Sequence, residues 1–365
     1  MPTTTTILAT LAVTLTLSAA YVSRRRLSRS RVGLGRRTVL LPNAGVRMPL
    51  VGLGTWQAPK GEVGAAVLAA LMAGYRHIDC ASCYGNEREV GTALKHAIRD
   101  KGIRRSDLFV TSKLWNSEHA PEHVRASCLK SLEDLGLEQL DLYIIHWPQQ
   151  FEHVDGTIAG FPRNEDGSIK YARVPIIETW RAMEKLVDEG LVRAIGVSNF
   201  NARQVRELCD AARILPACNQ VESHPFMQQA PLLEACKERG VVLTAYSPLG
   251  SGAKVDGHTV ASHPVLQRIG DKHRRSAAQV AVAFQARRGV PTFPKSVSEK
   301  RLRQNLDVAA LVDDLDADDL DALRALEAHE RIGFGGAKVE RNGRLEPRDL
   351  VHPDYPWNAD GTERA

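Results

Sequence analysis

Residues 74–87 read Gly-Tyr-Arg-His-Ile-Asp-Cys-Ala-Ser-Cys-Tyr-Gly-Asn-Glu. The order of residue types predicts a short apolar strand that ends in an acid, then a turn that carries a tyrosine, then a helix. Asn86 or a neighbour can cap that helix, and Glu87 and Glu89 fall in its first turn, where the positive helix end favours acids. The stretch therefore predicts exposed polar groups at the C-terminal edge of a strand.

Two later apolar runs end in the same way, each closed by one ionisable residue. The run 108–115 carries Lys113, and the run 140–148 carries His146. Successive parallel strands present their C-terminal ends at one edge of a sheet or barrel. An acid, a tyrosine, a lysine and a histidine at such ends make a plausible site for proton transfer.

The whole chain from residue 50 alternates strand and helix patterns through eight cycles. The predicted strands are 51–55, 76–80, 108–113, 140–146, 194–198, 217–222, 241–246 and 291–294. Helical patterns lie between them, for example 62–73, 121–135, 176–189, 202–212 and 276–288. The alternation predicts an α/β fold, a single (β/α)8 TIM barrel with its active site at the C-terminal strand ends.

Additions to the barrel are predicted at three places. Residues 38–49 read as a hairpin with Asn-Ala-Gly at its turn. The connection 148–174 after the fourth strand is too long for an ordinary loop and is a candidate substrate lid. A helix is expected at 316–328, before a tail, 330–365, that is rich in Gly, Pro and Arg.

The four ionisable strand-end residues, in their order, resemble the tetrad of the aldo-keto reductase family. The matching residues are Asp79, Tyr84, Lys113 and His146. The resemblance extends over residues 38–357 and implies a monomeric enzyme that reduces aldehydes and some ketones with NADPH, without a metal. It also implies that the hairpin closes the barrel floor and that 330–365 is a C-terminal specificity loop and tail.

Carbonyl reduction needs a proton donor, and an ordinary tyrosine, with a pKa near 10, is a weak acid at neutral pH. A lysine ammonium about 4 Å away contributes on the order of 4 kcal/mol, which could lower the pKa of the phenol by up to about 3. We therefore expect Tyr84 to donate the proton, Lys113 to tune it, Asp79 to hold Lys113, and His146 to orient the carbonyl oxygen. Taken singly, Asp79 could be a capping acid, Lys113 a solvated residue at a strand end, and His146 a buried histidine with its hydrogen bonds satisfied. Their conjunction carries the inference.

The cofactor site is predicted without a G-x-G-x-x-G motif, which disfavours a Rossmann mode of binding. A lysine, hydroxyls and an arginine around a helix N-terminus near residue 295 make an anion site. It resembles the family's pocket for the 2′-phosphate and adenine of NADPH, although a phosphorylated substrate is an alternative. The matching residues are Lys295, Ser296, Ser298, Arg301 and Asn305.

Further segments resemble the family's nicotinamide and pyrophosphate contacts. The resemblance implies that Ser198, Asn199 and Gln220 hold the carboxamide and that Tyr246 stacks on the nicotinamide, unless Tyr246 is simply a buried strand residue. It also implies pyrophosphate contacts from Ser247, Leu249 and Ser251, and a site border at Thr55 and Trp56. The loop 252–258 departs from the family because it has no acidic clasp residue directly after Ser251.

The substrate pocket is expected to be aromatic, from Trp56, Trp147, Phe151 and Phe161. Segments 161–167 and 347–357 resemble the NADP-dependent aldehyde reductase branch, in which the arginine matching Arg348 meets carboxylated aldehydes. A solvated loop arginine is the alternative for Arg348. A sugar or polyol reductase is the second enzyme reading, and an NADPH-sensing regulatory subunit at a membrane is the reading from another class.

The N-terminal leader, 1–37, differs in composition from the rest. The chain has 365 residues, 43% hydrophobic and 25% charged, which is ordinary for a globular protein. Its net charge of +5 comes from seven arginines in the leader, so no nucleic-acid partner is implied. The uncharged run 7–22 before Arg24 predicts a short membrane anchor with a cytosol-facing barrel, 38–329. A mitochondrial or plastid transit peptide and an unanchored tail are the alternatives.

Overall fold

The computed structural model describes residues 37–156, 160–329, 331, 338–341, 344–358 and 363–364. Its central sheet is parallel, and its strands neighbour one another in sequence order from β3 to β9. The strands are β3 (Leu53–Gly54), β4 (His77–Asp79), β5 (Phe109–Leu114), β6 (Leu142–Ile145), β7 (Ile195–Ser198), β8 (Cys218–Glu222) and β9 (Val242–Tyr246). Each predicted strand from the first seven cycles is present, usually shortened by a residue or two at its ends.

The eighth predicted strand, 291–294, closes the sheet through isolated bridges. Thr292 pairs in parallel with Ala245 at the end of β9 and with Val51 before β3. The Phe293 amide donates to Ala245 O at 3.1 Å, and the Thr292 amide donates to Leu50 O at 2.9 Å. These bonds join the last strand to the first, so the predicted (β/α)8 barrel is confirmed.

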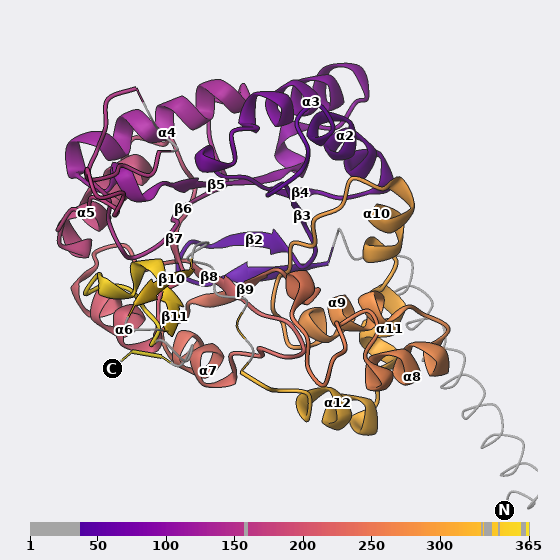
Figure 1. The fold of residues 1–365 in the computed structure, drawn as a ribbon. Coiled ribbons are helices and arrows are strands. Elements are labelled where there is room, and N and C mark those ends of the chain that lie inside the picture. The colour runs from indigo at the N-terminus through magenta and orange to yellow at the C-terminus, as the bar shows by residue number, and fades with distance from the viewer. Residues whose placement is uncertain are drawn as a thin grey trace, which may run out of the picture.

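Helices surround the closed sheet on its outer side (Figure 1). They are α2 (Val63–Ala73), α3 (Glu87–Asp100), α4 (Pro121–Leu135), α5 (Ile176–Asp188), α6 (Ala202–Ala211), α7 (Ala230–Glu238), α8 (Pro264–His273), α9 (Ala277–Arg287), α10 (Glu299–Leu306), α11 (Ala309–Asp314) and α12 (Ala317–Arg324). Capping boxes at Asn201 and Ser276 fix the starts of α6 and α9, because each side chain accepts from the backbone three residues later. The helix expected at 316–328 is α12, which ends earlier than predicted.

The predicted capping role of Asn86 is wrong. Asn86 precedes α3, but its side chain makes no capping hydrogen bond. Its side-chain nitrogen, Nδ2, donates instead to Thr55 O at 2.9 Å. The Asn86 side chain therefore fixes the loop that follows β3 and does not cap α3. Glu87 and Glu89 do lie in the first turn of α3, as predicted.

The N-terminal hairpin closes the barrel at the end opposite to the C-terminal strand ends. It consists of β1 (Thr38–Leu41) and β2 (Val46–Pro49), paired antiparallel, and it lies across the ring of strands in Figure 1. Its buried side chains Leu41, Val46 and Met48 pack in a cluster with Phe109 and Leu142, from the starts of β5 and β6. The hairpin is therefore the floor of the barrel.

The remaining additions lie around the C-terminal strand ends. In the connection 148–174, of which 157–159 are not described, antiparallel bridges pair Phe151 with Tyr171 and Arg163 with Ile169. The C-terminal segment forms a hairpin of β10 (Lys338–Arg341) and β11 (Arg344–Pro347), followed by a 3-10 turn, Arg348–Val351.

No helix in the described part of the chain is long and apolar enough to cross a membrane. The run 7–22, predicted as an anchor or part of a transit peptide, lies outside the described residues.

Candidate active site

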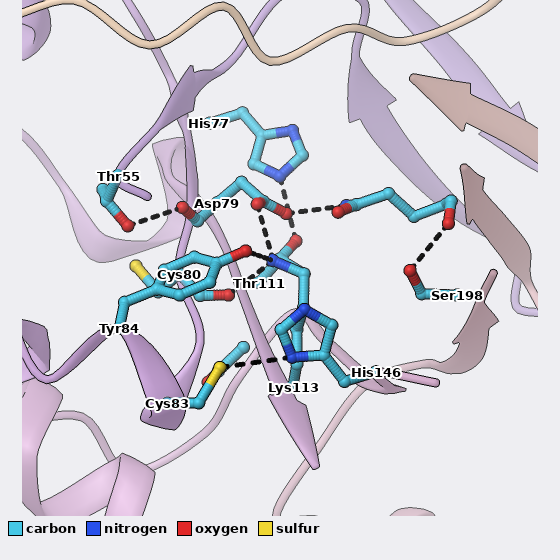
Figure 2. A network of polar contacts seen from close by, with 12 residues as sticks. Thr55, His77, Asp79, Cys80, Cys83, Tyr84, Thr111, Lys113, His146 and Ser198 are labelled. Atoms are coloured by element: carbon cyan, nitrogen blue, oxygen red, sulfur yellow. Dashed lines mark hydrogen bonds and ion pairs between the residues drawn. The ribbon is translucent and has the colours of Figure 1, made fainter. Parts of the chain in front are cut away.

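Lys113, in β5, is the centre of a buried hydrogen-bond network (Figure 2). Its ammonium donates to Asp79 Oδ1 at 2.6 Å, to Cys80 O at 2.7 Å and to Tyr84 Oη at 3.2 Å. The Lys113 side chain is 1% exposed and that of Asp79 is 5% exposed. A buried charge needs a partner and hydrogen bonds for its protons, and Lys113 has both. The structure thus brings the predicted acid, lysine and tyrosine into direct contact.

A tight turn places Tyr84 above the lysine. The 3-10 turn Ser82–Tyr84 follows β4 and ends at Gly85, whose φ of 66° lies in the left-handed region that favours glycine. His146 follows β6, and its ring centroid lies 5.8 Å from that of Tyr84. All four members of the predicted tetrad therefore meet at the C-terminal edge of the sheet.

Burial controls the protonation of the site. The pKa of Tyr84 is raised well above 10, first by burial and then by the negative charge of Asp79. This is opposite to the lowering expected from the sequence, because the charge of Lys113 was considered there without the burial of the phenol and without the charge of Asp79. The pKa of His146 is lowered well below 6.5, first by burial and then by Lys113. Both rings are therefore neutral at pH 7.

A cavity of about 440 Å³ opens over this network. Four predicted aromatic residues line it, Trp56, Trp147, Phe151 and Phe161. This volume lies in the range of small-molecule sites. Asp79, Tyr84 and His146 also border the cavity, whereas Lys113 is absent from its lining.

Several cavity residues were missed by the sequence reasoning. They include Gln57, Cys83, Trp115, Asn116, Gln149 and Asp349. Trp115 and Asn116 directly follow the strand that carries Lys113, so their position at a strand end was a usable signal. Cys83 Sγ lies 3.5 Å from His146 Nδ1, a contact between distant segments that no local pattern indicates.

Arg348 lines the cavity as predicted, but it is already paired. Its Nε and Nη2 donate to Asp349 Oδ1 and Oδ2 at 2.6 and 2.7 Å. The guanidinium also lies 4.7 Å from the ring centroid of Phe161. Its side chain is only 12% exposed, so the alternative of a solvated loop arginine is wrong.

The residues predicted to hold the nicotinamide form one connected wall. The Tyr246 hydroxyl donates to Asn199 Oδ1 at 2.8 Å, and Asn199 Nδ2 donates to Ser198 Oγ at 3.1 Å. Ser198 in turn donates to Gln220 O at 2.6 Å, and Gln220 Nε2 donates to Asp79 Oδ2 at 2.7 Å. Asn199, Gln220 and Tyr246 line the cavity, and Ser198 supports them from behind.

The predicted anion site adjoins the cavity at Lys295, which is exposed. Ser296 Oγ accepts from Arg301 Nε at 3.4 Å and from the Ser298 amide at 3.1 Å. Ser298 precedes α10 but makes no side-chain capping bond, so the start of that helix keeps backbone donors for an anion. Asn305 is buried within α10.

The other predicted cofactor residues divide into two groups. Ser247, Leu249 and Ser251 line the cavity, and Ser251 Oγ donates to Ser247 Oγ at 3.0 Å. Thr55 is buried behind the cavity wall, where its hydroxyl donates to Asp79 O at 2.9 Å. Thr55 therefore supports the strand end that carries Asp79.

Comparison with known proteins gives consistent matches. The model of the aldo/keto reductase family matches residues 50–328. Aldo-keto reductase family 1 member A1 of Cricetulus griseus is 45% identical over 324 residues, 87% of this chain and 98% of that protein. The Homo sapiens protein of the same name is 44% identical with the same coverage.

Among solved structures, the aldose reductase from Schistosoma japonicum superposes with a TM-score of 0.76 at 39% identity. The match covers 86% of this chain and 96% of that one. The family predicted from the tetrad is thereby confirmed. The chain belongs to the aldo/keto reductase family, oxidoreductases that act on small carbonyl compounds.

Proposed function

We propose that the chain is an NADPH-dependent aldehyde reductase with Tyr84 as the proton donor. One observation carries the proposal: the Lys113 ammonium lies between Asp79 and Tyr84 Oη, and both of these residues border a cavity of substrate size. The relatives named family 1 member A1 match over nearly their whole length, which supports the aldehyde reductase branch.

The chemistry of the residues follows from their protonation. Because burial keeps the Tyr84 phenol protonated at neutral pH, it can give its proton to a carbonyl oxygen. The hydrogen bond from Lys113 steadies the negative charge that develops on the phenol oxygen. His146, neutral and next to the phenol, donates an N–H to the same carbonyl oxygen. Bound NADPH supplies the hydride for the carbonyl carbon.

The donor set of the chain fits this cofactor. Lys295, Arg301 and the uncapped start of α10 match a phosphate. The wall of Asn199, Gln220 and Tyr246 offers amide groups and an aromatic ring to a nicotinamide. We further propose that residues 38–329 are the catalytic barrel, that 330–365 set substrate preference through Arg348, and that 1–37 are a separate leader.

The test is NADPH oxidation by the full chain with a neutral aldehyde, D-glucuronate and D-xylose. Tyr84→Phe should abolish turnover while NADPH still binds, because the ring remains and only the hydroxyl group is lost. Tyr143→Phe is the matched control: Tyr143 is also buried, but its hydroxyl meets Ser127 outside the cavity lining, so turnover should persist. Turnover retained in Tyr84→Phe would exclude the proposed donor.

The same assay separates two other functions. The aldose reductase from Schistosoma japonicum favours a sugar reductase as the second candidate, which requires D-xylose to be preferred over D-glucuronate. Tight NADPH binding with no turnover of any carbonyl would instead support the regulatory subunit.

A further inference from the structure

Three side chains with metal-binding atoms meet outside the active-site cavity, where the connection 148–174 contacts the barrel. Glu118 ends the 3-10 turn Asn116–Glu118 after β5, and His123 lies in the first turn of α4. His153 belongs to the connection itself. One ligand atom from each residue lies within 4.8 Å of the others.

The three side chains are in close contact with one another. His153 Nδ1 lies 3.3 Å from Glu118 Oε1, and the rings of His123 and His153 stack with centroids 3.7 Å apart. The Glu118 side chain is only 5% exposed, although it is a carboxylate near the surface. Ser117 Oγ donates to it at 2.7 Å, as outer partners do for ligating carboxylates.

Two imidazoles and one carboxylate form a donor set that suits zinc and its neighbours in the transition series, and not magnesium. Metal–ligand bonds of about 2.0–2.2 Å need the three atoms to approach within about 4 Å of one another. The two ring planes are nearly parallel, so one ring must turn before both nitrogens face the same ion. His153 is exposed and His123 is half-buried, which leaves room for such a rotation.

The position of the three residues gives such an ion a structural effect. The Phe151 amide donates to Asn116 O at 2.9 Å, and Trp115 Nε1 donates to Gly160 O at 3.3 Å. These bonds already dock the connection on the end of β5. Phe151 and Phe161, which line the cavity, lie on the same connection. An ion held by His153 would fasten it two residues from Phe151.

We propose that Glu118, His123 and His153 bind one divalent transition-metal ion such as Zn²⁺. The bound ion would link the connection 148–174 to the barrel. The binding does not depend on the proposed reductase function. Only its consequence for the cavity does, through Phe151 and Phe161.

Calorimetric titration of the full chain with ZnCl2 tests the binding. We expect one zinc ion per chain and no heat from MgCl2. His153→Ala and Glu118→Gln should each weaken zinc binding by about tenfold or more, which corresponds to about 1.4 kcal/mol. His96→Ala is the matched control, because His96 is a surface histidine of α3 paired with Asp100 and should leave the affinity unchanged.

Hydrogen exchange tests the fastening. Zinc should slow amide exchange in residues 150–156 of the wild-type chain and not in His153→Ala, whose circular dichroism should match the wild type. Absence of stoichiometric zinc binding, or equal binding by wild type and both variants, would overturn the site. Specific binding with unchanged exchange in 150–156 would overturn the fastening.

Discussion

The Cys83 thiol lies 3.5 Å from His146 Nδ1, and the direction of the hydrogen bond between them depends on the tautomer of the histidine. Burial raises the pKa of Cys83 far above its usual value and lowers that of His146, so a thiol faces a neutral imidazole. We expect the S–H to donate to Nδ1, which would leave the ring proton on Nε2 for the carbonyl oxygen. Cys83 is in this respect a positioning residue.

Replacing the thiol should test this tautomer. We expect Cys83→Val to lower kcat by about five- to tenfold, the effect of one lost hydrogen bond, with the KM for NADPH unchanged. Cys83→Ser keeps a donor and should retain most of the activity. Steady-state kinetics of both variants decide the matter, since equal losses in Ser and Val would mean that the thiol only fills space.

The C-terminal segment around the turn Arg348–Val351 should influence how strongly the cavity attracts an anion. Asp349 neutralises Arg348 through two bonds, so a substrate carboxylate must compete with it. Asp349→Asn keeps the shape and can still accept from the Tyr171 hydroxyl, now at 2.7 Å. We expect the KM for D-glucuronate to fall by about tenfold and that for a neutral aldehyde to stay within about twofold. Kinetics with both substrates check this, and a parallel fall in both would contradict it.

The β1–β2 hairpin should matter for stability and not for chemistry, because it lies at the opposite end of the barrel. Met48 is fully buried in its cluster, so Met48→Ala should lower the free energy of unfolding by about 2–5 kcal/mol. Leu40, on the same hairpin but 45% exposed, is the control, and Leu40→Ala should change it by less than about 0.5 kcal/mol. Urea denaturation measures both. If Met48→Ala lowered kcat at temperatures where the variant is still folded, the hairpin would affect the chemistry as well as the stability.

For the molecule as a whole, the helices and strands could be predicted from local patterns in the sequence. The contacts that form only when the barrel closes could not. The helix predicted at 121–135 coincides with α4, and the tetrad follows from strand ends, because both are local patterns. The contact of Cys83 with His146 and the bond from Asn86 to Thr55 join distant segments, so only the closed barrel reveals them. The direction of the Tyr84 pKa also required burial, which one strand does not disclose.

Buried histidines distributed over the molecule should make it acid-sensitive. Burial lowers the pKa of His77 and His119 to about 3, and that of His146 well below 6.5. Below pH 6.5 the unfolded chain therefore takes up protons that the native protein does not. The free energy of unfolding consequently decreases as the pH is lowered. Glu87 acts in the opposite direction, because burial raises its pKa to about 7 and the native state keeps a proton that the unfolded chain releases above pH 4.5.

These three histidines and Glu87 together take up about two protons on unfolding between pH 6 and 5, which lowers the unfolding free energy by about 2.5 kcal/mol per pH unit. Denaturation at half-unit steps of pH measures this slope. His119 is the residue to change, since neither ring nitrogen has a hydrogen-bond partner among the described residues. His119→Phe should reduce the slope by about 1.4 kcal/mol per pH unit, because one proton fewer is taken up on unfolding. An unchanged slope would mean that His119 is already protonated in the native state, or that it does not titrate in the unfolded chain, and either would remove it from the account.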